Sequence, residues 1–152
     1  MKVAPLPRGT IAQRQFVIGA NAARVWDLLA TVTYQQLPLE QVDIVSLDTF
    51  RAVLRWGSGF IRFSFHVEGK LVDTIRPHSY GCVLRVKRGP IQIGVRVTLA
   101  LREIHEGNTE VFCTAVEERK GALTGLVLRR LQRNLALKMF DSIGARLEWL
   151  CS

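Results

Sequence analysis

The sequence predicts an α+β fold in which a curved antiparallel β-sheet of six to seven strands grips a long C-terminal α-helix. Two observations lead to this prediction. Apolar and polar residues alternate through the middle of the 152-residue chain, which is the period of half-buried strands. Over residues 122–150 the apolar residues instead recur every three or four positions without a proline, as in a helix buried along one side. Since no helical segment separates the strands, we expect them to be antiparallel.

The N-terminal part of the chain is expected to form one strand followed by one or two short helices. Residues 11–18 are strand-like, and residues 22–29 place their apolar side chains on one helical face. Asn21 is positioned to cap this helix. Pro38 limits any second helix that follows.

Four segments in the middle of the chain each have one apolar face. These faces consist of Phe50, Ala52, Leu54 and Trp56, then Ile61, Phe63, Phe65 and Val67, then Cys82, Leu84 and Val86, and finally Ile93, Val95, Val97, Leu99 and Leu101. Residues 88–90 (RGP) are typical of a turn. A hairpin closed by this turn would pair Val86 with Ile93 and Leu84 with Val95. All apolar side chains of the hairpin would then lie on the same side, as one buried face demands.

The last strand and the long helix complete the predicted fold. Residues 109–117 are strand-like, but both of their faces carry apolar side chains, so the alternation does not decide which face is buried. At ~1.5 Å per residue, a helix over residues 122–150 would be roughly 40 Å long and could cross the whole sheet.

Length and composition favour a single compact unit. A chain of 152 residues, 48% of them hydrophobic, can bury a sizeable core. We expect residues 1–8 to form a flexible tail and residues 9–152 a single domain. No apolar run resembles a signal peptide or is long enough to cross a bilayer, so we expect a cytoplasmic protein that can also lie at the periphery of the membrane. The three cysteines lack metal-ligand spacing and are expected to be buried thiols.

Several segments, taken in order, resemble one protein superfamily. Residues 16–26 (FVIGANAARVW) are similar to the opening of the START-like (SRPBCC) superfamily, the helix-grip proteins related to polyketide cyclases and lipid-transfer domains. Residues 65–69 (FHVEG), 73–80 (DTIRPHSY), 121–126 (GALTGL) and 140–147 (FDSIGARL) resemble its CoxG branch, which is associated with carbon monoxide dehydrogenase. The resemblance spans residues 10–150. One departure is the segment LPL at residues 37–39, where the family has an Ile-Pro-Gly type of turn.

The resemblance implies a cavity between sheet and helix that holds an apolar molecule. The residues expected to face inward are aliphatic or aromatic with one thioether, which suits a lipid-like, quinone-like or polycyclic ligand. They are Ile61, Phe63, Phe65, Leu84, Val86, Val95, Val97, Leu99, Leu131, Leu135 and Met139. From periodicity alone, the alternative is a filled core in which these side chains simply meet.

The sequence contains no recognisable catalytic motif. No zinc-binding pair of cysteines, HExxH, GxSxG or phosphate-binding glycine loop is present, and neither a metal nor a cofactor is expected. His66 alternates outward on its strand, and His78 and His105 lie at turns, so all three are expected to be solvated. Some relatives implied by the resemblance are cyclases or hydrolases with polar groups in the cavity. Candidates for such groups are Tyr34, Arg14 and Thr98.

The chain is strongly basic, with a formal net charge of +8. Arg129, Arg130 and Arg133 lie within ~100° of one another on the predicted helix, opposite its apolar stripe. These arginines either form an ordinary solvated face or meet an anionic membrane surface or an acidic protein. Nucleic acid is not the expected partner, because the basic residues are not interleaved with aromatics that could stack on bases.

Three functions remain open from the sequence. The first is a non-catalytic carrier of an apolar ligand, which the CoxG resemblance extends to an accessory of a membrane-associated redox enzyme. The second is an enzyme of the polyketide cyclase or dehydratase kind that uses the same cavity. The third is a protein-interaction module with a filled core. The polar side chains that face the cavity distinguish the first two, because catalysis needs convergent ionisable groups.

Overall fold

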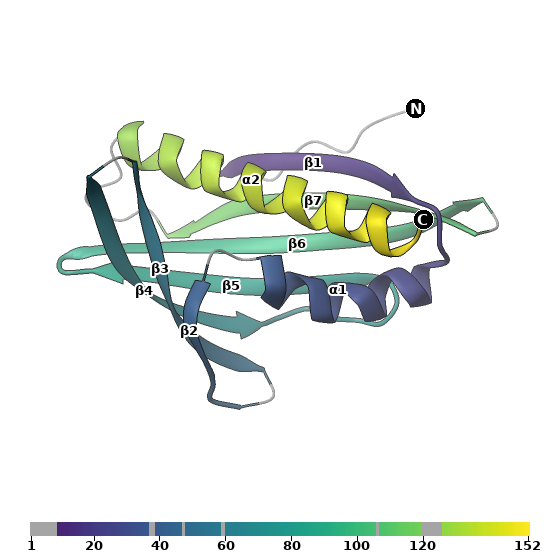
Figure 1. Cartoon of the computed structure of the whole chain (residues 1–152), viewed down its shortest axis with the longest axis horizontal. Coiled ribbons are helices and arrows are strands. Elements are labelled where there is room, and N and C mark those ends of the chain that lie inside the picture. Colours follow the sequence, from purple (N-terminus) through teal and green to yellow (C-terminus); the bar gives the residue numbers. More distant parts are fainter. Residues whose placement is uncertain (1–8, 37–38, 47, 59, 106, 120–125) are drawn as a thin grey trace.

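The computed structural model describes residues 9–36, 39–46, 48–58, 60–105, 107–119 and 126–152. Seven strands form one antiparallel sheet in the order β1-β7-β6-β5-β4-β3-β2. Helices α1 and α2 pack against each other and lie on the same face of this curved sheet (Figure 1). The elements are β1 (Thr10–Ile18), α1 (Ala22–Gln36), β2 (Leu39–Ile44), β3 (Thr49–Ser58), β4 (Ile61–Leu71), β5 (Ser79–Arg88), β6 (Ile91–His105), β7 (Asn108–Arg119) and α2 (Leu126–Leu150). The predicted fold class is confirmed.

The register of the β5–β6 hairpin is the predicted one. Val86 lies opposite Ile93, Leu84 opposite Val95, and Cys82 opposite Val97. Gly89 in the turn has a φ of 55°, a left-handed conformation that glycine adopts without a steric penalty. The alternating pattern therefore placed the apolar side chains of both strands on the face that α1 and α2 cover.

The segment between the first strand and β3 differs in detail from the expectation. A single helix, α1, continues to Gln36, and β2 follows it at the edge of the sheet. The sequence of β2 (LEQVDI) does not alternate, and its residues 40–44 are all exposed, so no buried face left a signal. The pairing of β2 with β3 is irregular between Glu40 and Asp43, and Gln41 has a φ of 51°.

The start of α1 is fixed by hydrogen bonds from two sides. The side chain of Asn21 accepts a hydrogen bond from the backbone N–H of Arg24 at 2.9 Å, as expected of an N-cap. Glu103 on β6 accepts a second one from the N–H of Ala22, also at 2.9 Å. The indole of Trp26 then donates to the carbonyl of Ser79 at the start of β5. The bonds to Glu103 and Ser79 attach α1 to the sheet.

The face of β7 that the sequence left undecided is clear in the structure. Val111, Cys113 and Ala115 are fully buried, whereas the residues between them are only partly covered. The largest buried cluster lies beneath the second half of α2. There Phe140, Ile143 and Leu147 pack against β1, β6, β7 and α1.

Candidate ligand site between the sheet and the C-terminal helix

The residues expected to bind a ligand occupy the inner face of the sheet and the facing side of α2. The structure describes the side chains of eight of them, while those of Ile61, Phe63 and Leu131 lie outside its described part. Phe65, Val97, Leu99 and Met139 are buried. The four that keep part of their surface accessible are Leu84, Val86, Val95 and Leu135.

These residues fall into two groups along α2. Val97, Leu99 and Met139 belong to the large packed cluster beneath the second half of the helix. Phe65 belongs instead to a smaller cluster with Leu54 and Val67. The side chains of Leu84, Val86 and Leu135 pack around this second cluster, and Leu84 and Val95 also pack against the edge of the large one. The predicted lining is therefore a well-filled core at one end of α2 and a looser apolar region at the other.

Apolar side chains in the looser region keep part of their surface accessible. Helix α2 packs mainly against β1 and α1, whereas Leu84, Val86 and Val95 come from strands nearer the middle of the sheet. These side chains point toward the helix and would be fully covered in a filled core. Their partial exposure, together with that of Leu135, leaves accessible apolar surface on the inner face.

Polar groups also face inward at this end of the molecule. Gln132 on α2 is only 7% exposed, and neither its amide nitrogen nor its amide oxygen has a hydrogen-bond partner among the described residues. Glu117 continues the inward-facing series of Val111, Cys113 and Ala115 on β7. The guanidinium carbon of Arg88 lies 5.7 Å from the centre of the Phe65 ring.

Sequence reasoning missed these three polar residues because glutamine, glutamate and arginine usually mark a solvent-exposed face. The signals that could have found them were positional. Glu117 and Arg88 extend the apolar alternation of their strands by one step, and Gln132 precedes Ala136 and Met139 at helical spacing.

The polar candidates that the sequence suggested do not gather in this region. Arg14 pairs with Asp141 on α2 at 3.0 Å, and both side chains are exposed. Thr98 lies between the buried residues Val97 and Leu99 and so belongs to the outer face, because side chains alternate along a strand. The side chain of Tyr34 lies outside the described part. His66, His78 and His105 are exposed, as predicted.

The cysteines are free thiols, and two of them are buried. Burial raises the pKa of Cys82 to about 11. Burial and, to a smaller extent, the charge of Asp141 raise the pKa of Cys113 to about 12. Both thiols therefore stay protonated near neutral pH, and since the thiolate is the reactive form, neither is an activated nucleophile.

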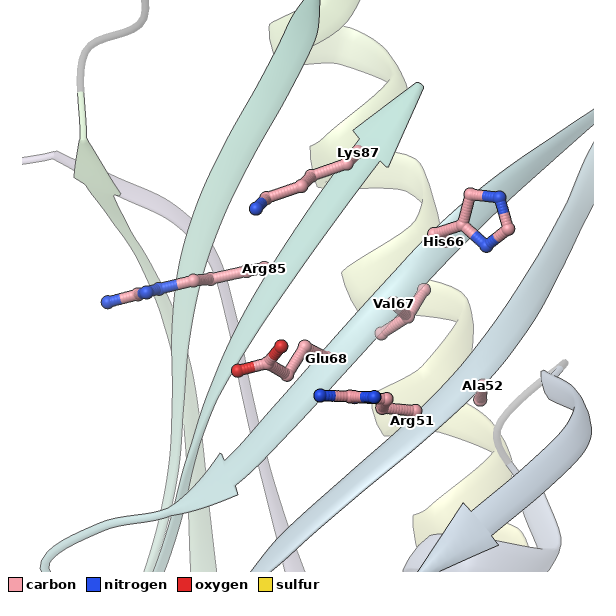
Figure 2. A pocket seen from close by; sticks show the side chains of 7 residues that line it. All are labelled: Arg51, Ala52, His66, Val67, Glu68, Arg85 and Lys87. Carbon is pink, nitrogen blue, oxygen red and sulfur yellow. The ribbon is translucent and has the colours of Figure 1, made fainter. Parts of the chain in front are cut away.

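A separate hollow of about 190 Å³ lies on the outer face of β3, β4 and β5 (Figure 2). Arg51 lies opposite Glu68, Glu68 opposite Arg85, and His66 opposite Lys87 in the strand pairing. Figure 2 shows the side chains of Arg51, Glu68, Arg85 and Lys87 projecting to the same side of the sheet. This lining is charged, so the hollow does not suit an apolar ligand.

Two of the three arginines that the sequence suggested as a partner surface are exposed. These are Arg130 and Arg133 on α2, whereas the side chain of Arg129 lies outside the described part. Within the described residues, no three metal-ligating side chains come together. In the same part of the chain, no helix is both long and apolar enough to span a membrane.

Comparison with known proteins relates this chain to others through its fold alone. No family model matches the sequence, and neither does any curated protein. A conserved protein from Geobacillus kaustophilus superposes with a TM-score of 0.70 at 17% identity, over 89% of this chain and 93% of the other. A START superfamily protein from Mycobacterium smegmatis gives 0.65 at 10% identity, over 91% and 97%. DynU16, from the dynemicin biosynthetic locus, gives 0.59 at 10% identity, over 93% and 48%.

These likenesses and the geometry define the class of fold. The curved seven-stranded antiparallel sheet, the helix after the first strand and the long C-terminal helix make up the START-like helix-grip fold. The fold that the resemblance implied is thereby confirmed.

Proposed function

We propose that this protein binds an apolar small molecule of a lipid-like, quinone-like or polycyclic kind between the sheet and the first half of α2. The observation that carries the proposal is the partial exposure of Leu84, Val86, Val95 and Leu135, although these side chains point toward the interior. Accessible apolar surface that faces inward gains free energy when a ligand covers it, at about 25 cal/mol per Å². Structures of the same fold include a START superfamily protein, which supports this proposal.

The proposed site uses part of the lining expected from the sequence. Phe65, Leu84, Val86, Val95 and Leu135 would contact the ligand directly. Val97, Leu99 and Met139 would form the packed floor that closes the site toward the second half of α2. Ile61, Phe63 and Leu131 remain candidates from the sequence.

A tryptophan at position 135 tests this site. Leu135→Trp places a larger apolar side chain in the accessible space, so we expect the affinity for the fluorescent probe N-phenylnaphthylamine to fall at least tenfold. Lys138→Trp adds the same ring to an exposed position on the same helix and should leave affinity unchanged. Probe titration by fluorescence measures both variants. If the wild type does not bind the probe, or if both variants bind as the wild type does, the proposed site is wrong.

We further propose that the protein acts as a carrier that delivers its ligand at an anionic membrane surface, as an accessory to a membrane-associated redox enzyme of the CoxG kind. The exposed residues Arg130 and Arg133 lie on the same stretch of α2 as Leu135, so a docked helix would bring the accessible apolar region close to the membrane. An acidic protein is the alternative partner for these arginines.

A cyclase-like or dehydratase-like enzyme is the second candidate function. The observation that favours it is the presence of two ionisable residues, Glu117 and Arg88, on the inner face beside the proposed site. A dehydratase would remove one water from a bound substrate, and a cyclase would at least convert it to an isomer, whereas a carrier would release it unchanged. Liquid chromatography with tandem mass spectrometry of a ligand that co-purifies from the native host, before and after incubation, detects both kinds of change.

A further inference from the structure

We propose that Gln132 recognises a carbonyl or hydroxyl group of the ligand, and that the protein therefore prefers a neutral apolar molecule bearing such a group over a pure hydrocarbon. This inference rests on the proposed function, because it assigns the polar end of the ligand in the same site. Gln132 is a polar side chain that α2 buries together with apolar ones.

The position of Gln132 on α2 places its amide at the looser end of the interior. At about 100° per residue, Gln132 lies within roughly 40° of Ala136, Met139 and Ile143, the residues that α2 buries. It lies one turn closer to the start of the helix than Ala136. Leu135, which follows it on the same turn, packs around the cluster of Leu54, Phe65 and Val67. The amide is thus held inside the molecule beside the accessible apolar surface.

The amide of Gln132 has no hydrogen-bond partner in the part of the chain that the structure describes. Both Nε2 and Oε1 are buried without a partner. Buried polar groups in folded proteins are nearly always paired, and an unpaired one lowers stability. A methionine or leucine would fill the same volume without that loss. A glutamine at this position is explained if a ligand supplies the missing partner.

The chemistry of the amide defines the ligand group. An amide offers both a donor and an acceptor without carrying charge. It can donate to a ketone or quinone carbonyl, or exchange hydrogen bonds with a hydroxyl. A site built to pair with a polar group also discriminates against ligands that lack it, because the protein amide then stays unpaired.

Matched probes test the preference. Menadione is compared with methylnaphthalene, and a medium-chain methyl ketone with the alkane of the same length, each by displacement of N-phenylnaphthylamine. We expect the wild type to bind the carbonyl compounds about tenfold more tightly than their hydrocarbon partners. Gln132→Met should reduce this preference to about twofold or less while binding the hydrocarbons at least as well.

Thermal unfolding without ligand provides a second readout. Gln132→Met removes a buried unpaired amide at nearly constant volume, so its melting temperature should rise by roughly 3–8 °C. Asn134→Met, on the exposed side of the same helix, is the control. Its melting temperature should rise less than that of Gln132→Met, and its preference for carbonyl compounds should equal that of the wild type.

The outcomes separate the inference from the proposed function. If no probe binds the wild type, the proposed function fails. If the probes bind but Gln132→Met keeps the carbonyl preference, the inference is overturned and the site stands. A melting temperature below that of the wild type would also overturn it, because Gln132 would then pair within the protein itself.

Discussion

At Gly69 the sheet has no room for a side chain. The ring of Phe50, which lies directly opposite on β3, fills the space where a β-carbon would be, and Phe50 is only 3% exposed. The ring covers the backbone of a glycine that would otherwise weaken the strand. Because the buried ring cannot move into solvent, a single methyl group at this position would force the packing to shift.

We therefore expect Gly69→Ala to lower the free energy of unfolding by about 1–3 kcal/mol, the usual cost of overpacking. Urea denaturation followed by circular dichroism measures it. The matched control is Gly19→Ala, since the nearest atom to a β-carbon there, Oδ1 of Asn108, is 3.9 Å away. If both alanine variants had equal stability, the contact between Gly69 and Phe50 would not constrain the sheet.

Among the elements, α2 has two separate surfaces, a buried side and an exposed basic side. Arg130 and Arg133 are exposed, and they are the residues that we propose to meet an anionic surface. The outer face of the sheet offers a second basic surface around Arg85 and Lys87. Both pairs carry the same charge, so a comparison between them separates a specific docking surface from the overall positive charge.

Arg130→Gln together with Arg133→Gln should weaken binding to vesicles that contain anionic lipid by roughly thirtyfold, because each basic residue near such a surface contributes about 1 kcal/mol. The matched variant, Arg85→Gln with Lys87→Gln, should bind nearly as the wild type. Sedimentation with vesicles at several salt concentrations measures both, and added salt should mimic the first variant. Equal binding by the two variants, or no binding by the wild type, would contradict docking through α2.

The elements also differ in how far the sequence could predict them. The β5–β6 register followed from the alternation together with the turn at residues 88–90, because the alternation shows which face is buried and the turn shows which residues pair. The strand β2 could not be predicted, because its exposed residues 40–44 have no buried face to produce a pattern. Gln132 was missed for the opposite reason, since its burial contradicts its chemistry. At the proposed ligand site, the solvent preference of a residue type therefore disagrees with the buried position that the residue takes in the fold.

At the scale of the whole molecule, the two ends of the chain pack against each other. The first strand pairs with the last one, and α2 packs against β1 and α1. The large core cluster accordingly combines residues from near both ends of the chain, such as Ile18 and Leu147. We propose that residues 9–152 fold as a single domain, because neither end of the chain can complete its packing without the other. The tail expected over residues 1–8 lies outside the described residues.

The packing of the two ends of the chain against each other predicts one cooperative unfolding transition. Far-ultraviolet circular dichroism, which follows the sheet and helices, and tryptophan fluorescence, which includes Trp26 on α1, should give the same denaturation midpoint. A variant that begins after Ile18 should lose the transition altogether. Two midpoints that differ beyond error would indicate that part of the chain unfolds on its own.

The irregular pairing of β2 has a consequence for how copies of this protein behave toward one another. A sheet that ends in a regular strand presents an unbroken row of backbone donors and acceptors, onto which a strand of another molecule can add. Here β2 is short, and its pairing shifts between Glu40 and Asp43, where Gln41 turns the backbone into the left-handed region. An incoming strand could not stay in register across this break. The irregularity therefore protects an edge that exposes Val42 and Ile44 from growing into a larger intermolecular sheet.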